Sequence, residues 1–167
     1  MIKLIVAWDD NFLIGNSKTN KLPWHISEDL QWFKKTTLNN IVVMGKNTWY
    51  SLPYRPLKDR ENIVITSSVY VGDEVWHCKS LEEVPKLCEH RWPDKDIFII
   101  GGAQLYCYAL KLGIVDEIIV THIYGAYEGN IYFPISEEQW FAGNKWSKIT
   151  IFKCDTYERY RLVRIRK

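Results

Sequence analysis

The chain has 167 residues, of which 47% are hydrophobic and 25% are charged, with a net charge of +2 at pH 7. These values are typical of one globular domain, which we expect to span residues 1–167, and the near-neutral charge argues against a nucleic-acid-binding protein. No apolar run is long enough for a signal peptide or a membrane span, so we expect a cytoplasmic protein with no membrane partner.

Short apolar runs alternate with amphipathic stretches, which predicts an α/β layer fold. The first half is expected to contain, in order, a strand at Ile2–Trp8, a polar loop at Asp9–Lys21, a helix at Ser27–Thr37, a strand at Asn40–Met44, a short helix at Thr48–Leu52, and strands at Asn62–Thr66 and Val75–Cys78.

The second half continues the same alternation. It is expected to contain a helix from a Ser80–Glu83 capping box to about His90, a strand at Asp96–Ile100, a helix at Ala103–Lys111 closed by Gly113, a strand at Glu117–Ile123, and a hairpin of Trp146–Phe152 and Tyr157–Ile165. This order predicts a single-domain fold with a mostly parallel central sheet, an antiparallel C-terminal edge strand and flanking helices.

One carboxylate lies on the apolar side of the first predicted helix. At about 100° per residue, Asp29 falls beside Trp32 and Phe33, with Leu30 at the edge of the same arc. An ionised carboxylate is costly to bury, so Asp29 should meet a cationic or hydrogen-bonding group or border a ligand cavity. The purely structural alternative is that Ser27 caps the helix and Asp29 opposes its dipole in the first turn.

Two predicted strand-to-helix junctions begin with glycine, Gly45-Lys46-Asn47-Thr48 and Gly101-Gly102-Ala103-Gln104. Glycine allows a ligand to approach the backbone, and a helix N-terminus offers free N–H groups to phosphate. Two such junctions at the carboxyl ends of parallel strands would suit a dinucleotide. Neither matches a P-loop or the Gly-x-Gly-x-x-Gly fingerprint, so ordinary turn chemistry stays an alternative for each.

Other polar features have simpler interpretations. The hydroxyls of Thr66-Ser67-Ser68 end a strand and could meet a phosphate, although loop polarity is the slightly favoured explanation. The basic stretch Arg159–Lys167 alternates with apolar residues and is expected to be a strand with a solvated face. The cysteines show no Cys-x-x-Cys pair and the histidines no ligand spacing, so we expect reduced thiols and no metal site.

A set of short motifs occurs in a characteristic order along nearly the whole chain. The motifs are Ile14-Gly15, Leu22-Pro23-Trp24, Asp29-Leu30, Trp32-Phe33, Val43-Met44-Gly45, Thr48-Trp49, Ser51-Leu52-Pro53, Arg55-Pro56-Leu57, Arg60-Glu61-Asn62, Ile99 to Ala103, Thr121-His122-Ile123 and Tyr132-Phe133-Pro134. In this order and spacing, the chain resembles the dihydrofolate reductase family. The resemblance implies NADPH-dependent reduction of 7,8-dihydrofolate to 5,6,7,8-tetrahydrofolate, by hydride transfer from nicotinamide C4 to pterin C6 with solvent-derived protonation of N5.

The resemblance also implies roles for residues at the substrate site. Asp29, supported by Thr121, would bind the pterin, and Trp24 would hold an ordered water. The walls of the pterin site would come from Ile5, Val6 and Ile100, and the apolar slot for the p-aminobenzoyl ring from Leu30, Phe33, Leu52 and Leu57. Arg60 would bind the α-carboxylate of the substrate's glutamate. In this interpretation, the cost of burying Asp29 is met only when the pterin is bound.

A second set of matching residues would hold NADPH. It comprises Ala7, Ile14, Gly15, Leu22, Gly45, Lys46, Asn47, Thr48, Ile65, Thr66, Ser67, Ile100, Gly101, Gly102, Ala103, Gln104, Leu105 and Tyr106. Among these, Thr66, Ser67 and Lys46 would recognise the adenosine 2′-phosphate, which is the reason for NADPH rather than NADH. The implied partners are dihydrofolate and antifolate inhibitors, and the chain is expected to be a monomer.

The chain departs from the family pattern at several positions. Asn16–Lys21 lengthens the first loop, Leu22 stands where many members have Met, and Lys46 where Arg is common. Leu57-Lys58-Asp59-Arg60 replaces Leu-Pro-Gly-Arg, and Asn130 stands where many bacterial members have Asp.

The sequence leaves two alternative functions. One is a reductase of the same fold in riboflavin biosynthesis, against which Asp29, Trp24 and Arg60 favour folate. The other is a non-catalytic nucleotide- or RNA-binding module, against which the charge and the complete site argue.

Overall fold

The computed structural model describes residues 1–68, 72, 74–134 and 146–165, and it contains the following elements. The strands are β1 (Ile2–Trp8), β2 (Leu13–Gly15), β3 (Ile41–Gly45), β4 (Glu61–Ile65), β5 (Trp76–Cys78), β6 (Ile97–Gly101), β7 (Glu117–Ile123), β8 (Ile131–Tyr132), β9 (Trp146–Lys153) and β10 (Tyr157–Arg164). The helices are α1 (Ser27–Thr37), α2 (Lys46–Ser51), α3 (Glu83–Arg91) and α4 (Ala103–Leu112).

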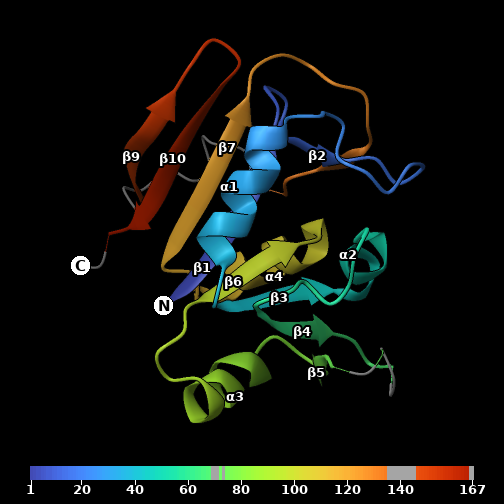
Figure 1. The fold of residues 1–167 in the computed structure, drawn as a ribbon. Helices are drawn as coiled ribbons and strands as arrows, with labels where there is room; N and C mark the ends of the chain where they lie inside the picture. Colours follow the sequence, from blue (N-terminus) through green and yellow to red (C-terminus); the bar gives the residue numbers. More distant parts are fainter. Residues whose placement is uncertain (69–71, 73, 135–145, 166–167) are drawn as a thin grey trace.

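Eight strands form one sheet in the order β5-β4-β3-β6-β1-β7-β10-β9 (Figure 1). The six strands from β5 to β7 pair in parallel. Strand β10 runs antiparallel to both β7 and β9, so the C-terminal hairpin forms one edge of the sheet. The predicted α/β architecture is therefore confirmed.

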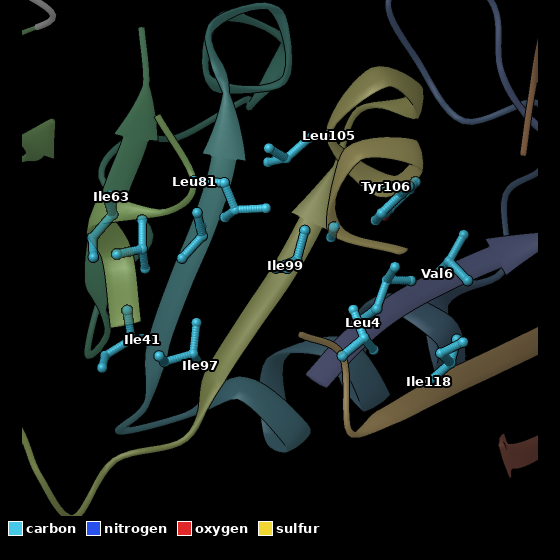
Figure 2. Packing of buried hydrophobic residues seen from close by; sticks show 14 of the residues in the cluster. Leu4, Val6, Ile41, Ile63, Leu81, Ile97, Ile99, Leu105, Tyr106 and Ile118 are labelled. Atoms are coloured by element: carbon cyan, nitrogen blue, oxygen red, sulfur yellow. The ribbon is translucent and has the colours of Figure 1, made fainter. Parts of the chain in front are cut away.

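The parallel strands are nearly continuous apolar runs because helices cover both faces of the sheet. On one face, Leu4 and Ile99 pack in one cluster with Leu105 of α4 (Figure 2). Val84 of α3 belongs to the same cluster. On the other face, the core of β1, β3 and β6 residues packs against α2, with Phe33 of α1 against it. Helix α1 lies along β1 and β7 on this second face, which is where Asp29 meets the sheet.

Most element boundaries agree with the predictions within two residues, but the capping of α1 and the start of α3 differ. Ile26, not Ser27, precedes α1, and no side chain caps that helix, so the predicted Ser27 N-cap is wrong. Helix α3 begins at Glu83 rather than Ser80, and the Glu83 carboxylate accepts a hydrogen bond from the Lys79 N–H at 3.2 Å. A glutamate reaching back to a preceding N–H is half of a capping box, displaced by one residue from the prediction.

The loop predicted at Asp9–Lys21 contains a strand that the sequence did not reveal. Leu13–Gly15 forms β2, which pairs antiparallel with β8 in a separate two-stranded sheet. Strands of three and two residues are too short for a period-2 pattern to be recognised.

The predicted solvated face of the C-terminal strand is wrong at its first arginine. Residues 157–164 do form β10, but the Arg159 side chain is buried and only 8% exposed. Arg159 lies in register with Thr121 of β7, on the face that α1 covers. Residues 166–167 of the basic stretch lie outside the described residues.

Candidate active site

Asp29 is buried at the first turn of α1, with 7% of its surface exposed. Burial raises the pKa of this carboxyl, while a hydrogen bond from Thr121 and the positive charge of Arg159 act in the opposite direction. The protein itself therefore meets part of the cost of burying this charge. The expectation that only a bound pterin offsets the desolvation cost of Asp29 is therefore wrong. The helix-dipole explanation is incomplete, because it includes no side-chain partner for this carboxylate.

Trp24 lies in a small apolar cluster with Ile123 and Tyr157, next to Ala7. Its indole Nε1 is buried and has no hydrogen-bond partner among the described residues. Because a buried N–H without a partner is costly, this donor fits a site where a water or a ligand atom accepts its hydrogen bond. The finding agrees with the role that the family resemblance implies for Trp24.

The backbone carbonyl of Ile5 accepts a hydrogen bond from the Tyr106 hydroxyl at 2.9 Å. Tyr106 comes from α4, and its complete burial raises the pKa of its hydroxyl well above the ordinary value. The Tyr106 hydroxyl is therefore a neutral donor that holds the β1 backbone against α4. This contact links a predicted pterin-site residue to a predicted cofactor-site residue.

Arg60 is presented by a turn that Asn62 holds. The buried Asn62 amide exchanges two hydrogen bonds of 2.9 Å with the Leu57 backbone and donates a third, of 3.0 Å, to the Arg60 carbonyl. Asp59 occupies the left-handed region with a φ of 60°, so this aspartate takes the conformation in which the family pattern has glycine. The turn Leu57-Lys58-Asp59-Arg60, which differs from the family's Leu-Pro-Gly-Arg, therefore still places Arg60 beside Phe33.

The Arg60 guanidinium is half-buried beside the predicted apolar slot. Its Nη1 donates to the Thr37 hydroxyl at 3.1 Å, and its Cζ lies 5.9 Å from the centroid of the Phe33 ring. Partial burial lowers the pKa of Arg60 from its ordinary value, but arginine stays protonated in proteins. A fixed cation here suits recognition of a carboxylate.

The two glycine junctions lie next to each other, as predicted. A Cβ atom added at Gly45 would lie 3.9 Å from the Gly101 carbonyl oxygen, and a Cβ atom at Gly101 or Gly102 would lie 3.4 Å from the Thr48 hydroxyl. Gly101 has a φ of 126°, which side-chain-bearing residues rarely adopt, and it is joined to Gly102 by a cis peptide bond. Gly45 and Gly102 precede α2 and α4, and no side chain caps either helix.

The structure brings together only part of the set of side chains predicted to bind the 2′-phosphate. Lys46 Nζ donates to the Ser68 hydroxyl at 3.1 Å, whereas the buried Thr66 hydroxyl accepts the Ser68 N–H at 3.0 Å. Ser67 is exposed. Ser68, which the resemblance did not assign, is therefore the hydroxyl that lies beside the cation.

The first loop is tied to the segment before β8. The Ser17 N–H donates to Asn130 Oδ1 at 2.9 Å, and Asn130 Nδ2 donates to the Ser17 hydroxyl at 2.7 Å. The Asn130 N–H also donates to the Gly15 carbonyl at 3.2 Å. Asparagine therefore braces this loop, although many family members use aspartate.

The remaining predicted residues are brought together to different degrees. Phe33, Leu52, Leu57 and Ile100 pack together against the core on the α1 face. Leu30 is 59% exposed and Leu22 is 41% exposed, so neither is enclosed by the described residues. The structure also adds Arg159, which periodicity alone had assigned to a solvated face.

The chain is similar to known proteins along nearly its whole length. The family model described as dihydrofolate reductase matches residues 1–163. The dihydrofolate reductase of Bacillus subtilis is 40% identical over 144 residues, which cover 84% of this chain and 80% of that protein. The dihydrofolate reductase of Neisseria meningitidis is 38% identical over 158 residues, which cover 93% of each.

A solved structure is similar over almost its full length. Dihydrofolate reductase from Enterococcus faecalis, complexed with NADP(H) and RAB-propyl, superimposes with a TM-score of 0.82 at 27% identity. The match covers 98% of this chain and 96% of that one.

Proposed function

Because the chain belongs to the dihydrofolate reductase family, we propose that Asp29 is the carboxylate that binds the pterin ring of its substrate. The protein is an NADP-dependent oxidoreductase that reduces 7,8-dihydrofolate to 5,6,7,8-tetrahydrofolate. When bound, NADPH supplies the hydride that passes from nicotinamide C4 to pterin C6, and solvent supplies the proton at N5.

The single observation that carries the role of Asp29 is its burial beside Thr121 on the covered face of the sheet. A buried carboxylate can accept hydrogen bonds from the 2-amino group and ring N3 of a pterin. In its ionised form it polarises the ring and favours protonation at N5, which is electrostatic stabilisation by a preorganised group. The N–H of Trp24 is a second buried donor that can hold a water near the ring.

Arg60 and the apolar slot serve the rest of the substrate. The guanidinium of Arg60 binds the glutamate α-carboxylate, for which a planar fork of donors is well suited. Phe33, Leu52 and Leu57 provide an apolar surface for the p-aminobenzoyl ring, with Arg60 fixed beside Phe33. Antifolate inhibitors that carry a p-aminobenzoyl ring would occupy the same apolar surface of Phe33, Leu52 and Leu57.

The two glycine junctions hold the cofactor. Their closeness at Gly45 and Gly101 leaves backbone accessible, and the uncapped starts of α2 and α4 offer N–H groups to the pyrophosphate. Lys46 and Ser68 form the pair that recognises the 2′-phosphate. The Thr66 hydroxyl orients Ser68 by accepting the hydrogen bond of the Ser68 N–H. The residues present therefore fit NADPH.

The decisive test of the reaction is the loss of NADPH absorbance with and without dihydrofolate, compared with NADH. We expect turnover only with dihydrofolate and a clear preference for NADPH. Failure to oxidise NADPH with dihydrofolate would favour a binding module instead.

Two variants test the assigned residues by single-turnover kinetics. Asp29→Asn should slow hydride transfer at neutral pH by roughly 100-fold, with partial rescue at low pH, where the substrate arrives protonated. Arg60→Leu should weaken substrate binding with little change in the hydride step. An unchanged hydride rate in Asp29→Asn would remove the proposed role of that carboxylate.

The same proposal extends to the state of the protein. We infer one reductase domain over residues 1–167, acting as a cytoplasmic monomer without nucleic-acid or membrane partners. The family match over residues 1–163 supports the single domain. No helix in the described part of the chain is long and apolar enough to cross a membrane. Light scattering on the eluted peak of a sizing column would test the monomer.

A further inference from the structure

Arg159 extends beneath the first turn of α1. It lies in register with Thr121 of β7, which is itself in register with Ala7 of β1, so Arg159 and Thr121 project from the same face of the sheet. Arg159 Nη2 donates to the carbonyl oxygen of Glu28 at 2.9 Å. The guanidinium therefore reaches the residue that directly precedes Asp29.

The guanidinium is held between two aromatic rings. Its Cζ lies 4.9 Å from the centroid of Trp32 and 4.7 Å from that of Tyr157. The Nε atom is buried and has no hydrogen-bond partner in the described residues. Arginine stays protonated even when buried, so this position retains a positive charge at a considerable desolvation cost.

The helix itself does not explain this cation. The start of a helix is the positive end of its dipole, so a cation against the first turn of α1 is electrostatically unfavourable. The two rings attract the guanidinium through cation–π contacts, and the Glu28 carbonyl accepts one of its hydrogen bonds. Neither the rings nor the carbonyl carries a net charge, and the nearby charged group that gains from the cation is the carboxylate of Asp29.

Other charged groups around Asp29 are paired elsewhere or exposed. The Glu28 carboxylate is exposed and accepts a hydrogen bond from Ser27. On β7, His122 pairs with Asp10 at 2.7 Å. On β10, Glu158 pairs with Lys148 at 2.9 Å and Arg161 with Glu117 at 3.3 Å. Arg159 is the charged group that acts on Asp29, where it opposes the rise in pKa that burial causes.

We propose that Arg159 is a positioning residue of the active site, which holds Asp29 in its ionised form and thereby sets the lowest pH at which the enzyme polarises its substrate. This inference rests on the proposed function of Asp29. Arg159 touches neither reacting ring in this scheme and acts only through the charge of the carboxylate. Arg159 thus supplies a cation near Asp29, which is one of the alternatives that the helical pattern of the sequence left open.

The test follows the titration of the Asp29 carboxyl by carbon NMR in the substrate-free protein, with Asp29→Asn used for assignment. Arg159→Met removes the charge, and Arg159→Gln removes it while keeping a donor for the Glu28 carbonyl. Arg161→Met is the matched control, because it removes a cation two residues further along the same strand. The pH dependence of single-turnover hydride transfer is measured on the same variants.

We expect both Arg159 variants to move the midpoint of the Asp29 titration upward by about one pH unit, a tenfold change in proton affinity. The hydride-transfer profile should move in the same direction, and Arg159→Lys should restore most of the shift. Arg161→Met should leave both midpoints in place. If Arg159→Met does not fold, Arg159→Gln carries the test.

Two failures are distinguishable. An unmoved Asp29 titration in the charge-removing variants overturns the inference about Arg159 alone. A normal hydride rate in Asp29→Asn overturns the proposed role of Asp29, whatever the titration shows.

Discussion

Replacing Asp29 by asparagine is expected to stabilise the protein at neutral pH while it slows the reaction. Burial raises the pKa of this carboxyl, so the folded state binds the proton more tightly than the unfolded state does. A group with a raised folded pKa favours folding below its unfolded pKa, about 3.9 for aspartate, and loses that contribution as the pH rises through the folded pKa. At neutral pH, the ionised Asp29 therefore costs folding free energy.

The size of the effect follows from the surroundings of the carboxylate. Single substitutions typically change stability by about 0.5–3 kcal/mol, and the removal of a buried charge acts through its desolvation. Thr121 and Arg159 offset part of the burial, so we expect Asp29→Asn to gain about 1–2 kcal/mol at pH 7. For a domain of this length, this gain corresponds to a rise in Tm of about 2–8 °C.

Urea unfolding followed by tryptophan fluorescence measures this difference at pH 7 and near pH 4. The gain should shrink toward the lower pH, because a growing fraction of Asp29 is then protonated in the original protein as well. Glu28→Gln is the matched control, since it removes a carboxylate from the same turn but from an exposed position, and it should change stability by less than about 0.5 kcal/mol. A loss of stability in Asp29→Asn at pH 7, or a gain equal at both pH values, would refute the reasoning.

Three further predictions concern the scaffold of the site. Gly101→Ala should lose about 1–3 kcal/mol of stability in urea unfolding, because Gly101 has a φ of 126°, and it should weaken NADPH binding in a fluorescence titration. Gly45→Ala is the control and should keep its stability, because Gly45 has an ordinary φ of −75°. Asn62→Leu should lose about 2–4 kcal/mol by urea unfolding, because it leaves the backbone groups that Asn62 now pairs without partners. Asn130→Ala should accelerate hydrogen exchange at the Ser17 amide, measured by NMR, because it removes the acceptor of that amide. Asn130→Asp keeps the acceptor and should preserve the protection of the Ser17 amide. Equal exchange rates in the two variants would contradict the role of Asn130 in holding the loop.

Local patterns were enough for the elements with clear periodicity. The predicted bounds of β1, α1 and β7 agree with the structure at both ends, because apolar runs and a helical stripe are encoded within each segment. Strands β2 and β8 were not predicted, because strands of three and two residues are too short to show an alternating pattern and only their pairing with each other identifies them. The N-cap of α1 was also misassigned, since Ser27 uses its hydroxyl for the neighbouring Glu28 carboxylate instead of the backbone.

The same division holds for the active site. The sequence by itself determined that Asp29 is on the buried side of a helix and that two glycine junctions end parallel strands, since spacing along one element reports the direction of each side chain. Only the tertiary structure decided what meets Asp29, because the partners come from β7 and β10 and depend on the register between those strands. Alternation along β10 shows that Arg159 and Arg161 share a face, but the packing of α1 decides which of the two cations is buried beside the carboxylate.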